Sequence, residues 1–148
     1  MIWFLSGVDT LSKEVTIDIK SKQDDGVEEE EIVSHNTGQL YQKNGTYYLK
    51  YEATATGLEG VKTTVKIEEE ELTIIRQGKL RTIQSFVPGT KTDFDYQTPH
   101  GALQLALKVN EWDLEINKTN GKINLGYDVY SQEEIVSNNQ LEIKYEED

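Results

Sequence analysis

Arg76 is the residue whose type and position point most directly to chemistry. It stands in Leu72-Thr73-Ile74-Ile75-Arg76-Gln77-Gly78 and shares the alternation of Leu72 and Ile74. Successive side chains of a strand point to opposite faces, so Arg76 points into the interior if those two do. A guanidinium there is costly unless paired, and its planar fork matches a carboxylate or phosphate. Arg76 therefore either binds a ligand anion, reaches solvent at its strand end, or pairs with a core carboxylate.

Tyrosines accompany this arginine on predicted inward faces. Tyr47 and Tyr51 share one face of a predicted strand, and Tyr96 shares a face with Phe94. A tyrosine ring can be buried while its hydroxyl still needs a partner. Together with Trp112 and Tyr127, these residues either line one cavity or belong to a filled core, and a filled core is slightly favoured because protein interiors are close-packed. The predicted ligand-binding residues are Arg76, Tyr47, Tyr51 and Tyr96.

Other chemical motifs are weak or missing. The chain has no cysteine and two histidines, which make a poor set for zinc or for nucleophilic catalysis. His35 has the parity of Val33 and is expected to point inward, whereas His100 lies in a Thr-Pro-His-Gly turn and is expected to be exposed. An ordinary structural role is favoured for both. We predict no catalytic residue, no metal site and no cofactor, and enzymatic activity is the least favoured class.

Period-two alternation sets the predicted elements. Apolar residues alternate with polar ones in stretches such as 15–20, 62–67, 103–109 and 141–146, which is typical of strands with one buried face. Asn44-Gly45 and Asn120-Gly121 are predicted as two-residue hairpin turns, and 131–136 as a hairpin loop. The predicted fold is all-β, a closed antiparallel up-and-down barrel of roughly 8–10 strands, calycin- or lipocalin-like. Residues 13–148 form the single barrel domain, and residues 1–12 form an N-terminal extension; whether residues 1–10 are native is left open.

Charge limits the partners. The formal net charge is −12 at pH 7, so nucleic acid and anionic membrane surfaces are excluded as expected partners. Absence of cysteine in a small domain favours a reducing compartment, and we expect a cytoplasmic protein.

Several segments resemble one protein family. The block Thr37 to Ile67, Arg76-Gln77-Gly78, the turn Tyr96-Gln97-Thr98-Pro99-His100-Gly101 and the late Gly126-Tyr127 are similar to the YwiB-like family of small bacterial proteins. The resemblance implies a calycin- or lipocalin-like barrel and a cytoplasmic bacterial setting. That family is a domain of unknown function, so the resemblance implies no substrate and no catalytic residue. The G-x-W motif of true lipocalins is missing, which argues against a secreted carrier.

Two functions follow as expectations. The first is a barrel that binds a small, partly apolar, anionic ligand through Arg76 and the inward tyrosines. The alternative is a filled barrel that acts through its surface, as a protein–protein interaction module or a homodimer.

Overall fold

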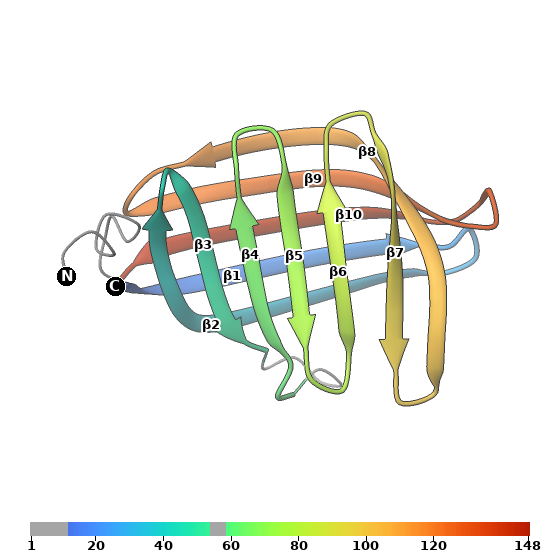
Figure 1. The fold of residues 1–148 in the computed structure, drawn as a ribbon, viewed down its shortest axis with the longest axis horizontal. Coiled ribbons are helices and arrows are strands. Elements are labelled where there is room, and N and C mark those ends of the chain that lie inside the picture. The colour runs from blue at the N-terminus through green and yellow to red at the C-terminus, as the bar shows by residue number, and fades with distance from the viewer. Residues whose placement is uncertain (1–11, 54–58) are drawn as a thin grey trace.

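The computed structural model describes residues 12–53 and 59–148 and folds them into ten antiparallel strands (Figure 1). The strands are β1 (Lys13–Asp24), β2 (Glu29–Lys43), β3 (Thr46–Glu52), β4 (Lys62–Ile67), β5 (Leu72–Gln77), β6 (Arg81–Phe86), β7 (Lys91–Thr98), β8 (Gly101–Ile116), β9 (Asn120–Ser131) and β10 (Glu134–Glu147). The described part of the chain contains no helix. The two-residue alternation in the sequence is the cause, because it gives each strand one apolar face to bury.

The sheet closes on itself. Each strand pairs antiparallel with its neighbours in the chain, and β1 also pairs with β10. In that last pairing Val15 lies opposite Glu147, and Asp24 lies opposite Asn138. The predicted closed antiparallel up-and-down barrel is confirmed, with ten strands. The N-terminal extension falls almost wholly on residues 1–11, which lie outside the described residues.

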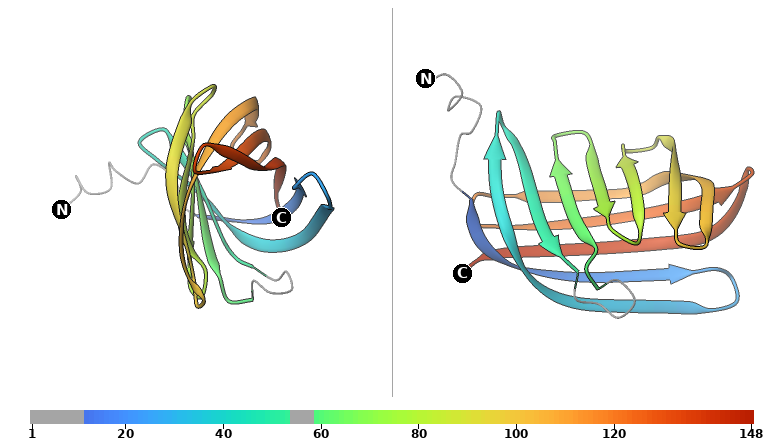
Figure 2. Two further views of the ribbon diagram at one scale, coloured as in Figure 1. Left: turned by 90° about the vertical axis from the view of Figure 1, so that its right-hand side faces the viewer. Right: turned by 60° about the horizontal axis from the view of Figure 1, so that its bottom comes forward.

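Two walls of different strand length enclose the interior. The strands β3 to β7 are short, whereas β1, β2, β8, β9 and β10 each have twelve residues or more. In Figure 1 the short strands run up and down in the view and the long ones run across it. Figure 2 shows the wall of short strands standing on one side of the barrel. The two inner faces meet crosswise, as in orthogonal sheet packing.

Register divides the inner face of the short wall into rows, because directly paired residues share a face. One row joins Tyr47, Ile67, Leu72 and Phe86 across β3 to β6. The next row joins Leu49, Val65, Ile74 and Gln84. Most of these side chains are fully buried, as are several that face them from the long strands: Val15, Ile17, Leu107, Ile123, Ile143 and Tyr145. This part of the barrel is filled with side chains.

Tyr145 anchors the filled part. Its hydroxyl donates to the carbonyl oxygen of Asn117 at 2.7 Å and accepts the Asn117 backbone N–H at 3.3 Å. The ring lies over Gly121, where an added Cβ would collide with its atoms. Burial raises the pKa of Tyr145 to about 12, although the bond to the Asn117 backbone lowers it. The hydroxyl therefore stays protonated well above neutral pH.

The turns agree with the sequence in part. Asn44 and Gly45 have φ of 52° and 83°, so the predicted two-residue turn is confirmed there. At Asn120-Gly121 the prediction is wrong: both residues belong to β9, neither has positive φ, and the turn spans Asn117 to Asn120. The segment 131–136 is a hairpin end as expected, with positive φ at Gln132 and Glu133.

Candidate functional site

Arg76 points into the barrel, as its parity predicts. It lies in one row of directly paired, inward-facing residues that crosses five strands. The members of this row are Tyr51 on β3, Thr63 on β4, Arg76 on β5, Thr82 on β6 and Tyr96 on β7. We call it the polar row. In Figure 1 it runs along the lower part of the short wall, where the arrowheads of β3, β5 and β7 lie.

The guanidinium of Arg76 has a neutral partner. Its Nη1 donates to Oε1 of the buried Gln84 at 3.1 Å. Within the described residues no carboxylate lies within ion-pair distance of Arg76. The buried polar residues of the barrel are also uncharged: Asn36, Thr63, Thr82, Gln84 and Ser137. The interpretation of Arg76 as half of a buried ion pair is therefore wrong for the described chain, and its charge meets only neutral dipoles inside the barrel.

Two tyrosines close to Arg76 are held in their neutral form. Burial raises the pKa of Tyr51, while the charge of Arg76 and a hydrogen bond with Thr63 lower it by less. Burial also raises the pKa of Tyr127 on β9, again against a smaller lowering by Arg76. Tyr127 packs edge-to-face on Phe86, with 5.0 Å between ring centroids. Both phenols therefore keep their protons at neutral pH and are available as hydrogen-bond donors.

Three of the four predicted site residues lie together. Arg76, Tyr51 and Tyr96 belong to the polar row, whereas Tyr47 lies four residues from Tyr51 on the same strand, about 13 Å away. Tyr47 faces the interior as predicted, but it neighbours Tyr145 in the filled part of the barrel. Parity alone places residues on a face; it does not say which row they occupy.

Sequence reasoning missed Thr82 and Gln84 as neighbours of Arg76, and it offered Tyr127 only as an aromatic side chain of the same cavity. Thr82 and Gln84 do alternate with the buried Phe86 on β6, so their inward parity is readable once Phe86 is taken as core. Tyr127 comes from the opposite wall, and no local spacing relates it to Arg76. Its place depends on how the long strands cross the short ones.

Apolar side chains continue the inner surface next to the polar row. Leu103 on β8 lies directly opposite Tyr96, and Leu105 lies opposite Phe94. Leu105 is partly buried against the core, while Leu103 is 59% exposed although it shares the inward face of Tyr96. Leu103 thus leaves apolar surface uncovered next to the polar row.

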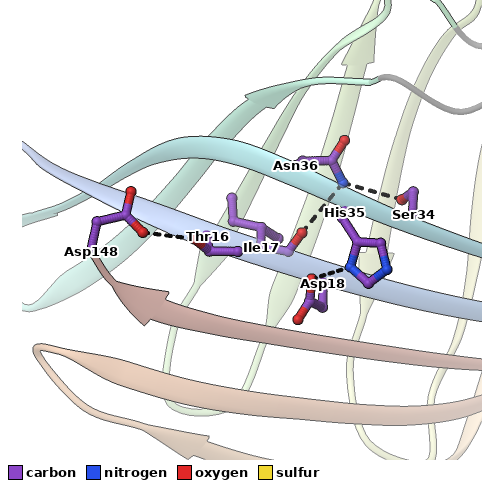
Figure 3. A network of polar contacts seen from close by, with 7 residues as sticks. All are labelled: Thr16, Ile17, Asp18, Ser34, His35, Asn36 and Asp148. Atoms are coloured by element: carbon purple, nitrogen blue, oxygen red, sulfur yellow. Dashed lines mark hydrogen bonds and ion pairs between the residues drawn. The ribbon is translucent and has the colours of Figure 1, made fainter.

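His35 does not point inward, so that prediction is wrong. In Figure 3 the imidazole of His35 and the amide of Asn36 leave opposite sides of β2, and Nδ1 of His35 lies 2.6 Å from Oδ1 of Asp18 on the outer face. Val33, whose parity suggested the orientation, is itself 55% exposed near the end of the hairpin. The inward residue is Asn36, which donates to Ser34 Oγ at 3.1 Å. His100 is exposed in its turn, as expected.

The outer face of the long wall carries polar hollows that contrast with the polar row. They run over β1, β8, β9 and β10 and are lined by interleaved lysines, carboxylates and amides. Two of these lysines have acidic partners: Lys22 lies 3.7 Å from Glu31, and Lys144 lies 3.5 Å from Glu142. Exposed pairs of this kind are ordinary solvated surface and contribute little energy. They do not present an uncompensated charge as the polar row does.

The fold and site define a class: a closed ten-stranded antiparallel barrel with a filled part and an interior row of uncharged donors around one arginine. Residues 17–143 match the family model described as a domain of unknown function, DUF1934, and the chain belongs to that family. The chain is 30% identical over 132 residues to the uncharacterized beta-barrel protein YwiB of Bacillus subtilis (strain 168), a match that covers 89% of this chain and 92% of that protein. The crystal structure of the ywiB protein from Bacillus subtilis superposes with a TM-score of 0.86 at 27% identity, covering 99% of both chains. The YwiB-like resemblance is confirmed.

These matches establish the fold and the family, and the descriptions of both relatives state no activity. Across the ranges that the structure describes, no group of three or more histidine or acidic side chains is arranged to hold a metal ion. The same ranges hold no helix of the length and hydrophobicity that crossing a membrane requires. The case for function therefore depends on the polar row itself.

Proposed function

We propose that the barrel binds a small, partly apolar, anionic molecule, with the anionic group at Arg76. The observation that carries this is the inward guanidinium with no carboxylate partner in the described chain. A partly buried cation without a counter-ion destabilises a folded protein, whereas a bound anion would neutralise it. Arg76 uses one donor on Gln84, and the remaining donors of its fork suit a planar anion.

The surroundings support the apolar part of this ligand. Tyr96, Tyr127 and Leu105 all pack against the hydrophobic core near the polar row, and each presents apolar surface to the interior. The exposed inward face of Leu103 extends that surface. A ligand with an anionic head and an apolar body would bury both kinds of surface at once, which is the usual composition of a small-molecule site.

Replacing Arg76→Met tests the proposal. We expect anilinonaphthalene sulfonate, a fluorescent probe with an apolar body and one negative charge, to bind the wild type. Loss of a charge-assisted hydrogen bond should weaken this binding by about 10- to 100-fold. The matched control is Arg81→Met, which removes the same charge from the exposed, outward face of the same β5–β6 hairpin. Equal affinities for Arg76→Met and Arg81→Met, or no probe binding by the wild type, would overturn the proposal.

A surface role is the second candidate, favoured by one observation. Apolar side chains stand exposed at the ends of two hairpins that lie side by side through the β1–β10 pairing: Val27, Ile32, Val33, Ile135 and Val136. Sedimentation of the wild type against Val33→Glu would test a homodimer at this end. A monomer at all concentrations would remove the homodimer version of this alternative. The cytoplasmic location stays a prediction.

A further inference from the structure

Thr82 carries the one buried side-chain nitrogen or oxygen of the described chain that has no hydrogen-bond partner. The residue is 4% exposed, so water does not reach this hydroxyl freely. Thr82 lies directly opposite Arg76 on one side and Tyr96 on the other. The unpaired hydroxyl thus lies in the polar row between Tyr96 and Arg76, the one charged residue of the row.

An unpaired buried hydroxyl is a net cost to folding. Leaving such a group without a partner costs about 1–3 kcal/mol, and valine would fill the same space without that cost. Valine stands at buried inward positions nearby, as at Val65 on β4. Thr92 on the neighbouring strand β7 is satisfied, since its Oγ1 donates to the Ser85 carbonyl oxygen at 2.7 Å. A hydroxyl kept unpaired at this position is best explained by a partner that arrives with the ligand.

The charge of the interior limits what that partner is. Arg76 supplies one positive charge, and its neighbours Tyr51, Thr82 and Tyr127 are neutral donors. A monoanion would leave the site neutral, whereas a dianion would leave one buried negative charge uncompensated, which is costly.

We infer that the Thr82 hydroxyl donates a hydrogen bond to the head group of the ligand beside Arg76, and that this head group is a monoanion, namely a carboxylate on an apolar chain. The inference rests on the proposed function and adds a specificity residue and a ligand class to it. The phosphate monoester that Arg76 alone would also accept is disfavoured by the single charge.

Thr82→Val tests the residue. We expect octanoate, measured by displacement of anilinonaphthalene sulfonate, to bind this variant about tenfold more weakly. The same variant should unfold at a higher temperature than the wild type, because an orphaned hydroxyl has been removed. Thr82→Ser, which keeps the hydroxyl, should keep most of the affinity. The control Thr92→Val removes a partnered hydroxyl elsewhere on the wall, and it should lower the unfolding temperature without changing the affinity for octanoate.

A series of head groups on one chain length tests the ligand class with the wild-type protein alone. At pH 8 octanoate should displace the probe at lower concentration than octyl phosphate, octanol or octylammonium. Because the second ionisation of a phosphate ester falls near pH 6, octyl phosphate should gain on octanoate as the pH is lowered to 5. Tighter binding of octyl phosphate than of octanoate at pH 8 would overturn the inference that the head group of the ligand is a monoanion.

The outcomes separate this inference from the proposal beneath it. If Arg76→Met weakens octanoate binding while Thr82→Val leaves it unchanged, the role of Thr82 is wrong and the anion site stands. If neither substitution changes the affinity for octanoate, or if octanol displaces the probe as well as octanoate does, the anion site at Arg76 and the role of Thr82 are both wrong.

Discussion

Arg76 and Thr82 are paired across two strands, and the side chains of both lack an ideal partner in the free protein. Arg76 meets the neutral Gln84 where an ion pair would be expected, and the Thr82 hydroxyl meets nothing. Elsewhere the barrel satisfies its buried groups, as at Asn36 and Tyr145. Buried polar or charged groups without a matching partner, in a molecule that otherwise pairs such groups, are expected at a ligand-binding site. This contrast, rather than any single residue type, locates the site.

Tyr145 gives a prediction of pH dependence. Its pKa of about 12 in the folded protein lies above the ordinary tyrosine value of 10.0. The raised pKa means that folding favours the protonated phenol, so this stabilisation is complete below pH 10 and is lost as pH rises towards 12. Its full size is about 2–3 kcal/mol. Tyr51 and Tyr127 act in the same direction.

Urea unfolding at pH 8 and pH 11 measures this loss. We expect Tyr145→Phe to be less stable than the wild type at pH 8, because it lacks the bonds to Asn117, and to lose less stability on going to pH 11. Tyr48→Phe removes a phenol that stacks on Tyr41 at the outer surface, and it serves as the control for general alkaline effects. A wild-type loss matched by Tyr145→Phe would contradict the assignment.

At the scale of elements, the dipeptides Asn44-Gly45 and Asn120-Gly121 have the same sequence but different structural roles. Gly45 occupies a hairpin turn at a φ of 83°, and a Cβ added there would meet nothing within 4 Å. Gly121 lies in β9 without positive φ, and its missing side chain leaves room for the ring of Tyr145. The dipeptide signal for a turn is local and cannot register a contact with a strand more than twenty residues further on. Sequence alone therefore predicts the first pair correctly and misplaces the second.

A double-mutant cycle distinguishes the two roles. Gly45→Ala should cost about 1–2 kcal/mol, since an L-residue is strained at positive φ. Gly121→Ala should cost about 1–3 kcal/mol through overpacking. In a Tyr145→Leu background the cost of Gly121→Ala should fall, whereas the cost of Gly45→Ala should not change. Chemical denaturation of the six proteins measures both couplings, and equal costs of Gly121→Ala in the two backgrounds would disprove the steric explanation.

The same difference between local and distant information explains what the sequence predicted of the site. Alternation placed Arg76, Tyr51 and Tyr96 on the inner face, because parity is a property of each strand alone. The common row of these three residues, and the separation of Tyr47 from them, depend on strand register across hairpins. Tyr127 approaches Arg76 from the crossing wall. The prediction for His35 was wrong because its reference residue Val33, although apolar, is exposed near the end of the hairpin and does not mark the inward face. The approximate strand number followed from turn spacing and closure from the single apolar face of each strand, whereas the polar row could not be predicted from either.

At the scale of the whole molecule, the charge outside opposes the charge inside. The chain carries −12 overall, yet its proposed ligand is an anion that must approach Arg76. Twelve charges at about 15 Å repel a monoanion by about 3 kcal/mol in water before screening. The contact with Arg76 lies inside the barrel, where salt screens little, while the repulsion crosses solvent, where salt screens strongly.

Binding of the anion should therefore strengthen as salt is added, opposite to the behaviour of an exposed ion pair. The Debye length shortens from about 30 Å at 0.01 M to about 8 Å at 0.15 M, so we expect about a tenfold gain in affinity for octanoate over that range. Octanol has no charge, so the salt dependence of its dissociation constant, corrected for the salt dependence of probe binding itself, measures the apolar contribution, which is subtracted. Arg81→Met makes the outer surface more negative and should enlarge the effect. Affinity that falls with salt would place the anion on the surface rather than at Arg76, because only an exposed contact is screened more strongly than the field of the whole protein.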